Sequence, residues 1–350
     1  MRVAIDARTL QEASPGGVGR SLANLIPLLA KEADLVLLTD AGRPPVSAPQ
    51  PQHPLRTPVR GVSASWLQLS APRWLRTFDG LFHCPFYGLP MWLPVPGVVT
   101  LHDLTFEHFP DWYSRRQGLS FRLQARRAAK TARAIVTVSE FVKADIVDTY
   151  GVTPDRIIVA PHGLDPVFRS DRSAEPHLAA LGVDGPYIVA LGGAARRNVG
   201  AAIRAWQLLR RDGSQVGLVV VGGYPPAPAS GLVHVARPPD EVWAAILAGA
   251  LAFVYPTLYE GFGMPGLEAL GAGTPVVAAR VGSLPEVLGD AAAWSPTTSA
   301  ADLHQVLGEL LADDDRRREL RQSGLHRAEG ARGWGAGADA HLEAYRRALE

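Results

Sequence analysis

Cysteine and long apolar runs are scarce in this chain of 350 residues, and each shortage excludes a class of protein. The single cysteine, Cys84, has no partner for an internal disulfide and no second thiol for a metal site, which favours a reducing compartment. The longest apolar run, 244–256, is well short of the roughly 20 residues that cross a bilayer. Arg2 and Asp6 stand where an export signal needs apolar residues. We therefore expect a cytoplasmic protein without a membrane span.

An excess of charge of one sign is missing as well, since 35 basic residues balance 34 acidic ones. A nucleic-acid-binding protein usually carries a strong positive field, so we expect no nucleic-acid partner. Several catalytic signatures are also absent, namely Gly-Lys-Ser/Thr, His-Glu-x-x-His, Cys-x-x-Cys and Gly-x-Ser-x-Gly. These absences leave few competing classes of enzyme.

Short β-branched runs alternate with amphipathic stretches, which predicts an α/β fold with parallel strands joined by helical crossovers. The first half is expected to have strands at 3–5, 35–38, 97–101, 134–138 and 157–160, with an irregular proline-rich loop at 42–58. Ser139 is predicted to cap a helix that Gly151 ends. The second half is expected to have strands at 187–190, 216–221, 252–255 and 275–278, after a linker at 161–186.

The strongest motif spans residues 255–270, where a strand is followed by a tight turn and a helix. Its two carboxylates, Glu260 and Glu268, flank the predicted start of that helix. A helix N-terminus attracts a diphosphate, Gly261 and Gly263 allow close backbone approach, and carboxylates accept hydrogen bonds from sugar hydroxyls. The pattern thus suits a phosphorylated sugar. The alternative is a solvated loop residue and an ordinary helix residue.

A second candidate site lies at 191–198, between a predicted strand and a helix beginning near Val199. Its adjacent arginines, Arg196 and Arg197, suit a diphosphate and would stabilise it as a leaving group without a metal ion. The alternative is a solvated pair of arginines.

Two further candidates follow strands in the first half. Gly16 and Gly17 open a helix after the first strand, but their spacing fails the dinucleotide-binding fingerprint, so NAD is not predicted. A simple tight turn without any ligand contact is the alternative interpretation of these two glycines. His102 and Asp103 end a strand at the edge where α/β sheets bind ligands, although a lone histidine is often structural.

A basic stretch runs from Arg115 to Arg133, with seven basic residues, no acidic one, and Leu119, Phe121 and Leu123 interleaved. It suits a solvated helix face. It also suits a peripheral contact with an anionic acceptor, such as a lipid-linked sugar at the inner face of a membrane.

Taken together, these segments resemble glycosyltransferase family 4, a family of retaining enzymes with the GT-B fold, over nearly the whole chain. The spacing of Glu260 and Glu268 matches the family's Glu-x(7)-Glu signature. The other matching segments are 16–20, 101–104, 137–141, 154–165, 273–277, 283–292 and Trp334. The resemblance implies two Rossmann-like αβα domains facing each other across a cleft. The first, 1–165, would take the acceptor and the second, 166–333, the donor, while the helix 334–350 would cross back to the first.

The resemblance also implies roles for the candidate residues. Glu260 would meet hydroxyls of the transferred sugar, and Glu268 the ribose of the nucleotide. Backbone beside the donor would come from Gly261, Phe262, Gly263, Met264, Pro265, Gly266 and Leu267. Gly16 and Gly17 would touch the donor phosphate, and His102 would face the sugar, with Asp103 orienting it or the acceptor. Arg197 departs from the family pattern, which has lysine there, and the two cations are not interchangeable.

The implied reaction moves a hexosyl group from a nucleotide diphosphate sugar to a hydroxyl of a saccharide or lipid-linked acceptor. GDP-mannose is favoured over UDP- or ADP-linked sugars, and neither a metal nor a cofactor is expected. Catalysis would rest on electrostatic positioning, with the departing diphosphate helping to deprotonate the acceptor. Two alternatives remain open: a non-catalytic sugar-nucleotide-binding protein, and a nucleotide-sugar hydrolase or epimerase of the same fold.

Overall fold

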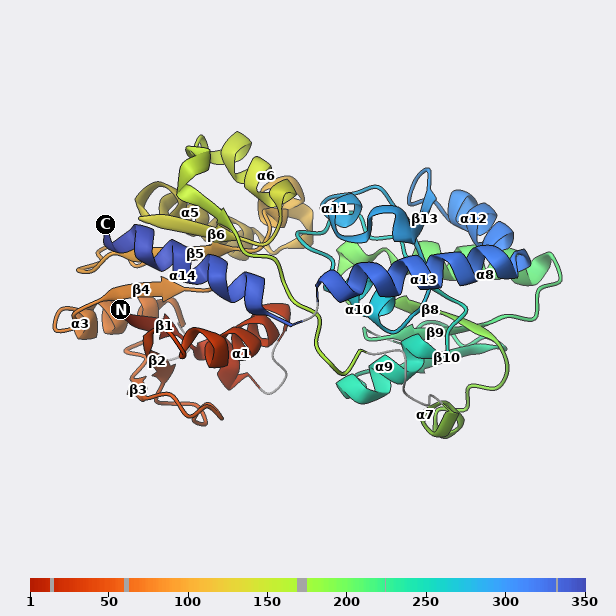
Figure 1. Cartoon of the computed structure of the whole chain (residues 1–350), viewed down its shortest axis with the longest axis horizontal. Helices are drawn as coiled ribbons and strands as arrows, with labels where there is room; N and C mark the ends of the chain where they lie inside the picture. Colours follow the sequence, from red (N-terminus) through yellow and green to blue (C-terminus); the bar gives the residue numbers. More distant parts are fainter. Residues whose placement is uncertain (13–15, 60–62, 169–174, 224, 332) are drawn as a thin grey trace. The chain divides into compact units, whose positions relative to one another are not determined.

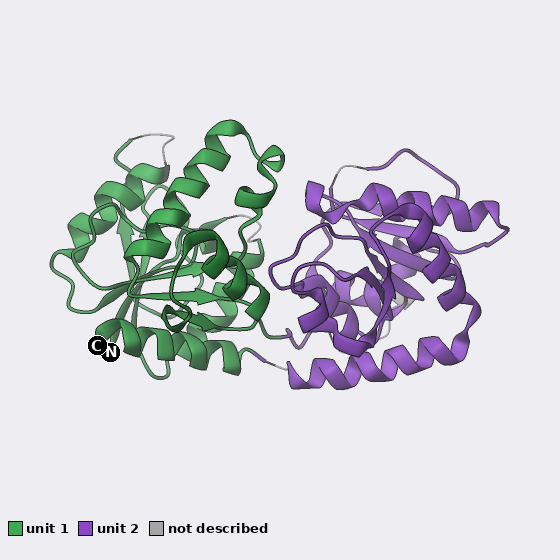
Figure 2. Cartoon of the chain, turned by 90° about the horizontal axis from the view of Figure 1, so that it is seen from above, with its two compact units in different colours: residues 1–163, 334–350 green, residues 164–333 purple. Residues whose placement is uncertain are grey.

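A computed structural model describes residues 1–12, 16–59, 63–168, 175–223, 225–331 and 333–350 (Figure 1). The chain forms two compact units (Figure 2). Unit 1 comprises residues 1–163 and 334–350, and unit 2 comprises 164–333, so the division falls at 163 rather than at the expected 165. Within the described ranges, no helix combines the length and apolar character that a membrane span requires.

Unit 1 is built on a seven-stranded parallel sheet in the order β3-β2-β1-β4-β5-β6-β7. The strands are β1 (Arg2–Asp6), β2 (Asp34–Asp40), β3 (Gln52–Leu55), β4 (Leu81–Cys84), β5 (Gly97–Leu101), β6 (Ala134–Thr137) and β7 (Ile157–Val159). The order reverses between β1 and β4, which places a topological switch point there.

Two of these strands correct the sequence prediction. β3 lies inside the stretch 42–58, which was expected to be irregular throughout, and pairs in parallel with β2 at the edge of the sheet. An edge strand tolerates Pro54 because one side of its backbone needs no partner. β4 was missed because it is only four residues long and fully buried, and therefore shows no alternation of polar and apolar residues.

The helices of unit 1 are α1 (Gly17–Leu29), α2 (Ser63–Ser65), α3 (Ala71–Leu75), α4 (Thr105–His108), α5 (Arg115–Thr131), α6 (Glu140–Tyr150) and α14 (Gly335–Leu349). A π-helical segment, η2 (Trp66–Ser70), joins α2 to α3, and short 3-10 turns lie at η1 (Arg8–Gln11), η3 (Pro110–Trp112) and η4 (Pro154–Arg156). The predicted caps of α6 are confirmed, since Ser139 accepts a hydrogen bond from the amide of Val142 and Gly151 has φ +65°.

The last helix, α14, packs against β6, β7 and α1 of unit 1. Figure 1 shows this helix lying along the sheet of unit 1. Its buried Tyr345 reaches the middle of that sheet, where the hydroxyl is hydrogen bonded to Nδ1 of His83 at 2.8 Å. The other ring nitrogen of His83 is hydrogen bonded to the hydroxyl of Thr100, also at 2.8 Å. The C-terminal segment is therefore part of the core of unit 1.

Unit 2 is built on a six-stranded parallel sheet in the order β10-β9-β8-β11-β12-β13. Its strands are β8 (Tyr187–Leu191), β9 (Gly217–Val221), β10 (Leu232–Val235), β11 (Ala252–Tyr255), β12 (Val276–Ala279) and β13 (Ala292–Ser295). Its helices are α7 (Glu175–Ala180), α8 (Val199–Arg211), α9 (Asp240–Ala248), α10 (Met264–Gly271), α11 (Leu284–Leu288), α12 (Ala300–Ala312) and α13 (Asp314–Gly330), with 3-10 turns η5 (Ala195–Arg197) and η6 (Gly289–Ala291).

The α/β class with two Rossmann-like parallel sheets is confirmed. Unit 2 nevertheless has two strands, β10 and β13, that the sequence analysis did not predict, and α7 lies inside the predicted linker 161–186. Apolar side chains on both faces of this sheet are buried: Val254 packs with Trp206 of α8 and Leu307 of α12 on one face, and the neighbouring Phe253 is buried on the other. Helices therefore cover the sheet on both sides, as a parallel sheet requires.

Candidate functional site

The sheet of unit 2 reverses its strand order between β8 and β11. Parallel α/β sheets bind ligands at the carboxyl ends of strands beside such a reversal. The loop after β8 carries Arg196 and Arg197, and the loop after β11 carries Glu260. The carbonyl oxygen of Arg196 joins the two loops, because it accepts hydrogen bonds from the amide of Leu258 at 2.8 Å and the hydroxyl of Thr257 at 3.1 Å. The fold thus brings two separately predicted motifs together.

Glu260 is buried and held from several sides. The hydroxyl of Tyr255 donates to Oε1, and Nε of Arg196 lies 3.5 Å from Oε2. The amide and the hydroxyl of Ser283 both donate to the carbonyl oxygen of Glu260 at 3.1 Å. Burial, followed by the charge of Glu260, raises the pKa of Tyr255 well above its ordinary value, so this hydroxyl remains a donor at neutral pH. The carboxylate is therefore fixed in position.

One glycine allows the backbone to approach Glu260 closely. Gly282 has φ +56°, and a Cβ there would lie 2.3 Å from the carbonyl oxygen of Glu260. Real side chains do not approach an oxygen so closely, so a larger residue would push the two segments apart. The orientation of Glu260 thus depends on a residue that precedes α11.

Glu268 is held by a residue that the sequence analysis missed. The indole Nε1–H of Trp243, on α9, donates to Oε2 of Glu268 on α10 at 2.8 Å. Both side chains are buried. Because a buried carboxylate is costly unless it is hydrogen bonded, Trp243 stabilises the charged form of Glu268 and sets its rotamer.

The start of α10 limits which backbone amides of the predicted donor site are available to a ligand. Gly263 caps the helix with φ +97°, and its carbonyl oxygen accepts the amides of Gly266 at 2.9 Å and Leu267 at 3.2 Å. Pro265 has no N–H to donate. The backbone donors expected along 262–267 are therefore restricted to residues before Pro265.

The two arginines have different surroundings. Whereas Arg196 lies beside Glu260, Nη1 of Arg197 donates to the carbonyl oxygen of Gly192 at 2.6 Å. This contact places the Arg197 guanidinium beside the turn that follows β8, where Gly193 has φ +107°. Two positive charges thus lie at the carboxyl end of β8, each held by a different partner.

In unit 1, Gly16 and Gly17 lie at the start of α1. Gly16 has φ −69°, which any residue adopts, and nothing in the described structure lies within 4 Å of where its Cβ would stand. Neither backbone strain nor packing among the described residues therefore calls for glycine at this position. The turn that would precede α1 falls on residues 13–15, which lie outside the described residues, so the tight-turn alternative stays open.

His102 follows β5 in a partly buried position. Its Nε2 is hydrogen bonded to the carbonyl oxygen of Pro85 at 3.1 Å, and its ring stacks on that of His162 with centroids 5.7 Å apart. Burial lowers the pKa of His102, although the Pro85 contact and the charge of Asp103 oppose this effect. The imidazole is therefore neutral near pH 7.

Asp103 makes a separate set of contacts. Its Oδ1 accepts hydrogen bonds from the amide of Thr105 at 3.1 Å, the hydroxyl of Thr105 at 2.7 Å and the hydroxyl of Tyr87 at 3.1 Å. These contacts fix the start of α4 and the loop that holds Tyr87, whose φ is +37°. The hydrogen bond of the His102 ring goes to the carbonyl oxygen of Pro85 and not to Asp103. The contacts of Asp103 therefore support the loop that contains it.

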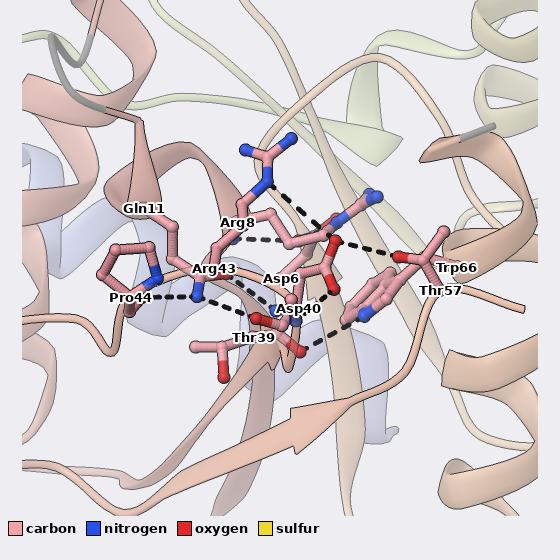
Figure 3. Close-up of polar contacts among 10 residues, drawn as sticks. Asp6, Arg8, Gln11, Thr39, Asp40, Arg43, Pro44, Thr57 and Trp66 are labelled. Carbon is pink, nitrogen blue, oxygen red and sulfur yellow. Dashed lines mark hydrogen bonds and ion pairs between the residues drawn. The ribbon is translucent and has the colours of Figure 1, made fainter. Parts of the chain in front are cut away.

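A polar network that the sequence analysis missed lies at the carboxyl ends of β1 and β2 (Figure 3). Arg8 forms a two-point ion pair with Asp6, with contacts of 2.9 and 2.7 Å, and its guanidinium lies 4.0 Å above the ring of Trp66. The indole N–H of Trp66 donates to the carbonyl oxygen of Thr39 at 3.2 Å, which ties this network to β2. The spacing Asp-x-Arg directly after a strand was a readable signal. The network holds η1, the turn that follows β1.

Asp6 of this network also affects the pKa of the buried thiol of Cys84. Burial and the nearby charge of Asp6 raise the pKa of this thiol to about 12. The thiolate is therefore not populated near neutral pH, and Cys84 does not act as a nucleophile.

Comparisons with known proteins match both halves of the chain to glycosyltransferases. Residues 15–168 match the family model described as Glycosyltransferase Family 4, and residues 185–313 match the model described as Glycosyl transferases group 1. An alpha-maltose-1-phosphate synthase from Mycolicibacterium smegmatis is 30% identical, with 99% of each sequence covered. An O-antigen chain mannosyltransferase B from Escherichia coli is 29% identical over 72% of this chain and 70% of its own. The structure of HepE from Anabaena, in complex with UDP and glucose, has a similar fold, with a TM-score of 0.72, 16% identity and 98% of each chain covered.

Proposed function

This chain belongs to glycosyltransferase family 4 and is a retaining enzyme that uses a nucleotide sugar, and we propose that it transfers a hexosyl group, with mannose favoured, to a saccharide or lipid-linked acceptor. The proposal rests on the arrangement of Arg196 and Glu260 at the switch point of unit 2. There a cation suited to a diphosphate and a carboxylate suited to sugar hydroxyls lie 3.5 Å apart.

We assign the donor contacts to unit 2. Glu260 would accept hydrogen bonds from the hexose, and Glu268 from the ribose. Arg196 and Arg197 would bind the two phosphates. The partial positive charge at the start of α10 adds to theirs. In this proposal the positive charges meet the diphosphate, and the carboxylates accept hydrogen bonds from the hydroxyls of the two sugars.

The proposed reaction is a substitution on one face of the sugar. The bond between the anomeric carbon and the phosphate oxygen breaks, and a bond from the acceptor oxygen forms on the same face, so the configuration is retained. The acceptor proton passes to the departing diphosphate. The two arginines stabilise the charge that develops on the phosphate, which is electrostatic catalysis by groups already in place.

Unit 1 is proposed to bind the acceptor, through residues at the carboxyl ends of its strands. His102, neutral near pH 7, would face the sugar and the acceptor hydroxyl. Gly16 and Gly17 would approach the donor phosphate, which fits the open space where a Cβ of Gly16 would stand. The buried, unpaired thiol of Cys84 fits a cytoplasmic location.

Mannose is favoured because the Escherichia coli relative is a mannosyltransferase. HepE was solved with UDP and glucose, so UDP-linked glucose is the main competitor. GDP-mannose, UDP-glucose and ADP-glucose should therefore be compared in one thermal-shift panel, because a ligand that binds only the native state raises the unfolding temperature. We expect the largest shift with GDP-mannose.

Turnover tests the reaction itself. Nucleoside diphosphate release should depend on a saccharide acceptor, and NMR of the product should show the anomeric configuration of the donor. Release of free sugar without an acceptor would identify a hydrolase instead. A thermal shift without any turnover across an acceptor panel would indicate a binding protein.

Site variants test the assignment of the charges. Arg196→Ala should lower kcat by at least about tenfold, because removing one preorganised charge costs a few kcal/mol in transition-state stabilisation. Arg211→Ala, at the exposed end of α8, is the matched control and should retain full activity. Equal activity in the wild type and Arg196→Ala would refute the assignment.

A further inference from the structure

Three surface segments of unit 1 contain no acidic residue. They are 63–77, 84–97 and 115–133; the first has two arginines, and the last has seven basic residues. The rest of the chain carries 26 basic residues and all 34 acidic ones, so it is net negative. Such a concentration of one sign creates a local positive potential on a nearly neutral protein.

Direct contacts join the three segments. The amide of Met91 donates to Oε1 of Gln68 at 2.7 Å, and Arg127 of α5 donates to the carbonyl oxygen of Met91. The guanidinium of Arg76 lies 4.8 Å from the ring centroid of Trp92. The segment 84–97 is therefore held by η2, by Arg76 directly after α3, and by α5, so that the three segments form one surface.

This surface also exposes large apolar side chains. The exposed fractions are 70% for Met91, 61% for Leu123, 58% for Leu119, 56% for Leu69 and 51% for Trp92. Single exposed apolar residues need no explanation, but a group of them on joined segments marks an interaction site. We call these five residues, with the basic residues of the three segments, the basic-apolar surface.

The exposed face of α5 shows how the two kinds of side chain are arranged. Arg116, Leu119, Leu123 and Arg127 recur at helical spacing along one exposed stripe. The opposite face is buried through Gly118, Ala125, Ala128 and Ala129. The two leucines therefore point away from the core of unit 1, with an arginine at each end of the stripe.

One acidic residue, Glu107, forms ion pairs with α5, and its charge is thereby neutralised. Glu107 on α4 pairs with Arg126 at 2.8 Å and lies 3.9 Å from Arg122. Arg115, Arg116, Lys130 and Arg133 are exposed. The surface thus keeps a positive charge after its internal ion pair is counted.

We propose that the basic-apolar surface docks the enzyme on an anionic lipid bilayer. Arginine and lysine suit lipid phosphates, while leucine, methionine and tryptophan insert at the level of the headgroups. A duplex nucleic acid would match the charges but not the exposed leucines. The inference deepens the proposed function and rests on its lipid-linked acceptor, because docking would bring unit 1 to the membrane that carries such an acceptor.

Vesicle co-sedimentation of the full chain, without any donor, tests the docking. The wild type should bind vesicles that contain phosphatidylglycerol at least tenfold more tightly than vesicles of phosphatidylcholine alone, and added salt should weaken the binding. Leu119→Ser combined with Leu123→Ser should reduce binding at least tenfold. Leu349→Ser, another exposed leucine of unit 1, is the matched control and should bind like the wild type.

Charge variants separate the two contributions. Arg116→Glu combined with Lys130→Glu should abolish the preference for anionic vesicles, whereas Arg211→Glu in unit 2 should keep it. Unchanged unfolding temperatures would show that the variants are folded. Absence of vesicle binding by the wild type, or equal binding by Leu119→Ser/Leu123→Ser, would overturn the proposal.

Turnover with a water-soluble acceptor distinguishes this result from failure of the proposed function. An enzyme that transfers sugar but binds no vesicles would refute only the docking. A protein that binds vesicles but releases no nucleoside diphosphate would refute only the proposed reaction.

Discussion

The indole N–H of Trp243 donates a 2.8 Å hydrogen bond to the carboxylate of Glu268, and both residues are buried in unit 2. They come from different helices, α9 and α10. If Glu268 binds the ribose, Trp243 is a positioning residue for the donor, because it fixes the carboxylate without touching the reacting atoms.

Trp243→Phe should weaken nucleotide binding. The change removes one donor from a buried carboxylate, at a cost of about 1–3 kcal/mol, and leaves the rotamer of Glu268 less defined. We expect the Kd for the nucleoside diphosphate, measured by calorimetry, to rise about tenfold. Trp206→Phe is the matched control, since Trp206 is a buried tryptophan of unit 2 whose indole N–H donates to the carbonyl oxygen of Val216. Equal nucleotide affinity in both variants would contradict the prediction.

Tyr255→Phe should lower kcat with little effect on nucleotide affinity. The missing hydroxyl frees the Glu260 carboxylate to turn, and a hydrogen bond to a charged group contributes about 1.5–3 kcal/mol, so kcat should fall roughly 10- to 100-fold. Tyr187→Phe serves as the comparison, because its buried hydroxyl donates to the carbonyl oxygen of Ile246 in the same unit. A loss of affinity with unchanged kcat would place Tyr255 on the nucleotide side instead.

Gly282→Ala should destabilise unit 2 and reduce activity together. The left-handed backbone costs about 1 kcal/mol or more for alanine, and the added Cβ would collide with the carbonyl oxygen of Glu260. Gly213→Ala isolates the collision, since Gly213 also has a positive φ but nothing lies within 4 Å of its Cβ position. Both variants should unfold at lower temperature, and only Gly282→Ala should lose turnover. Full activity in Gly282→Ala would show that Glu260 tolerates displacement.

Acidification should destabilise unit 1 through His341 of α14. Burial, followed by the charge of His102, lowers the pKa of His341 from 6.5 to about 4, although its hydrogen bond to the carbonyl oxygen of Gly337 opposes the shift. Between pH 6.5 and 4 the unfolded chain therefore binds a proton at this histidine and the folded chain does not. The free energy of unfolding is not reduced by His341 above pH 6.5, and it decreases as the pH falls towards 4. The loss attributable to His341 reaches about 3 kcal/mol.

Thermal unfolding between pH 7 and pH 5 measures this dependence. The ring of His341 faces His83, 5.5 Å away between centroids, and Tyr345 of its own helix, and burial also lowers the pKa of His83. The wild type should therefore lose stability steeply, and His341→Gln should show a shallower slope because His83 still contributes. An unchanged slope in His341→Gln would assign the effect to the other buried histidines.

Much of the candidate site was predictable because its parts lie within short segments. Glu260 and Glu268 belong to one strand-loop-helix segment, and Arg196 and Arg197 to another. Strand propensity and the loop residues place both at carboxyl ends of strands. Trp243 was not predictable, because its role depends on a side-chain contact between two helices. Asp6 and Arg8 were signalled by their spacing but were overlooked.

The sequence by itself determined the α/β class, the family and the charge of each motif, because apolar periodicity and motif spacing are properties of neighbouring residues. Only the tertiary structure decided that β8 and β11 lie side by side, which brings Arg196 within 3.5 Å of Glu260. It also decided that Tyr255, Trp243 and Ser283 hold the two glutamates. Contacts of this kind arise from packing between elements, and no local pattern of residues records which partner a buried carboxylate will meet.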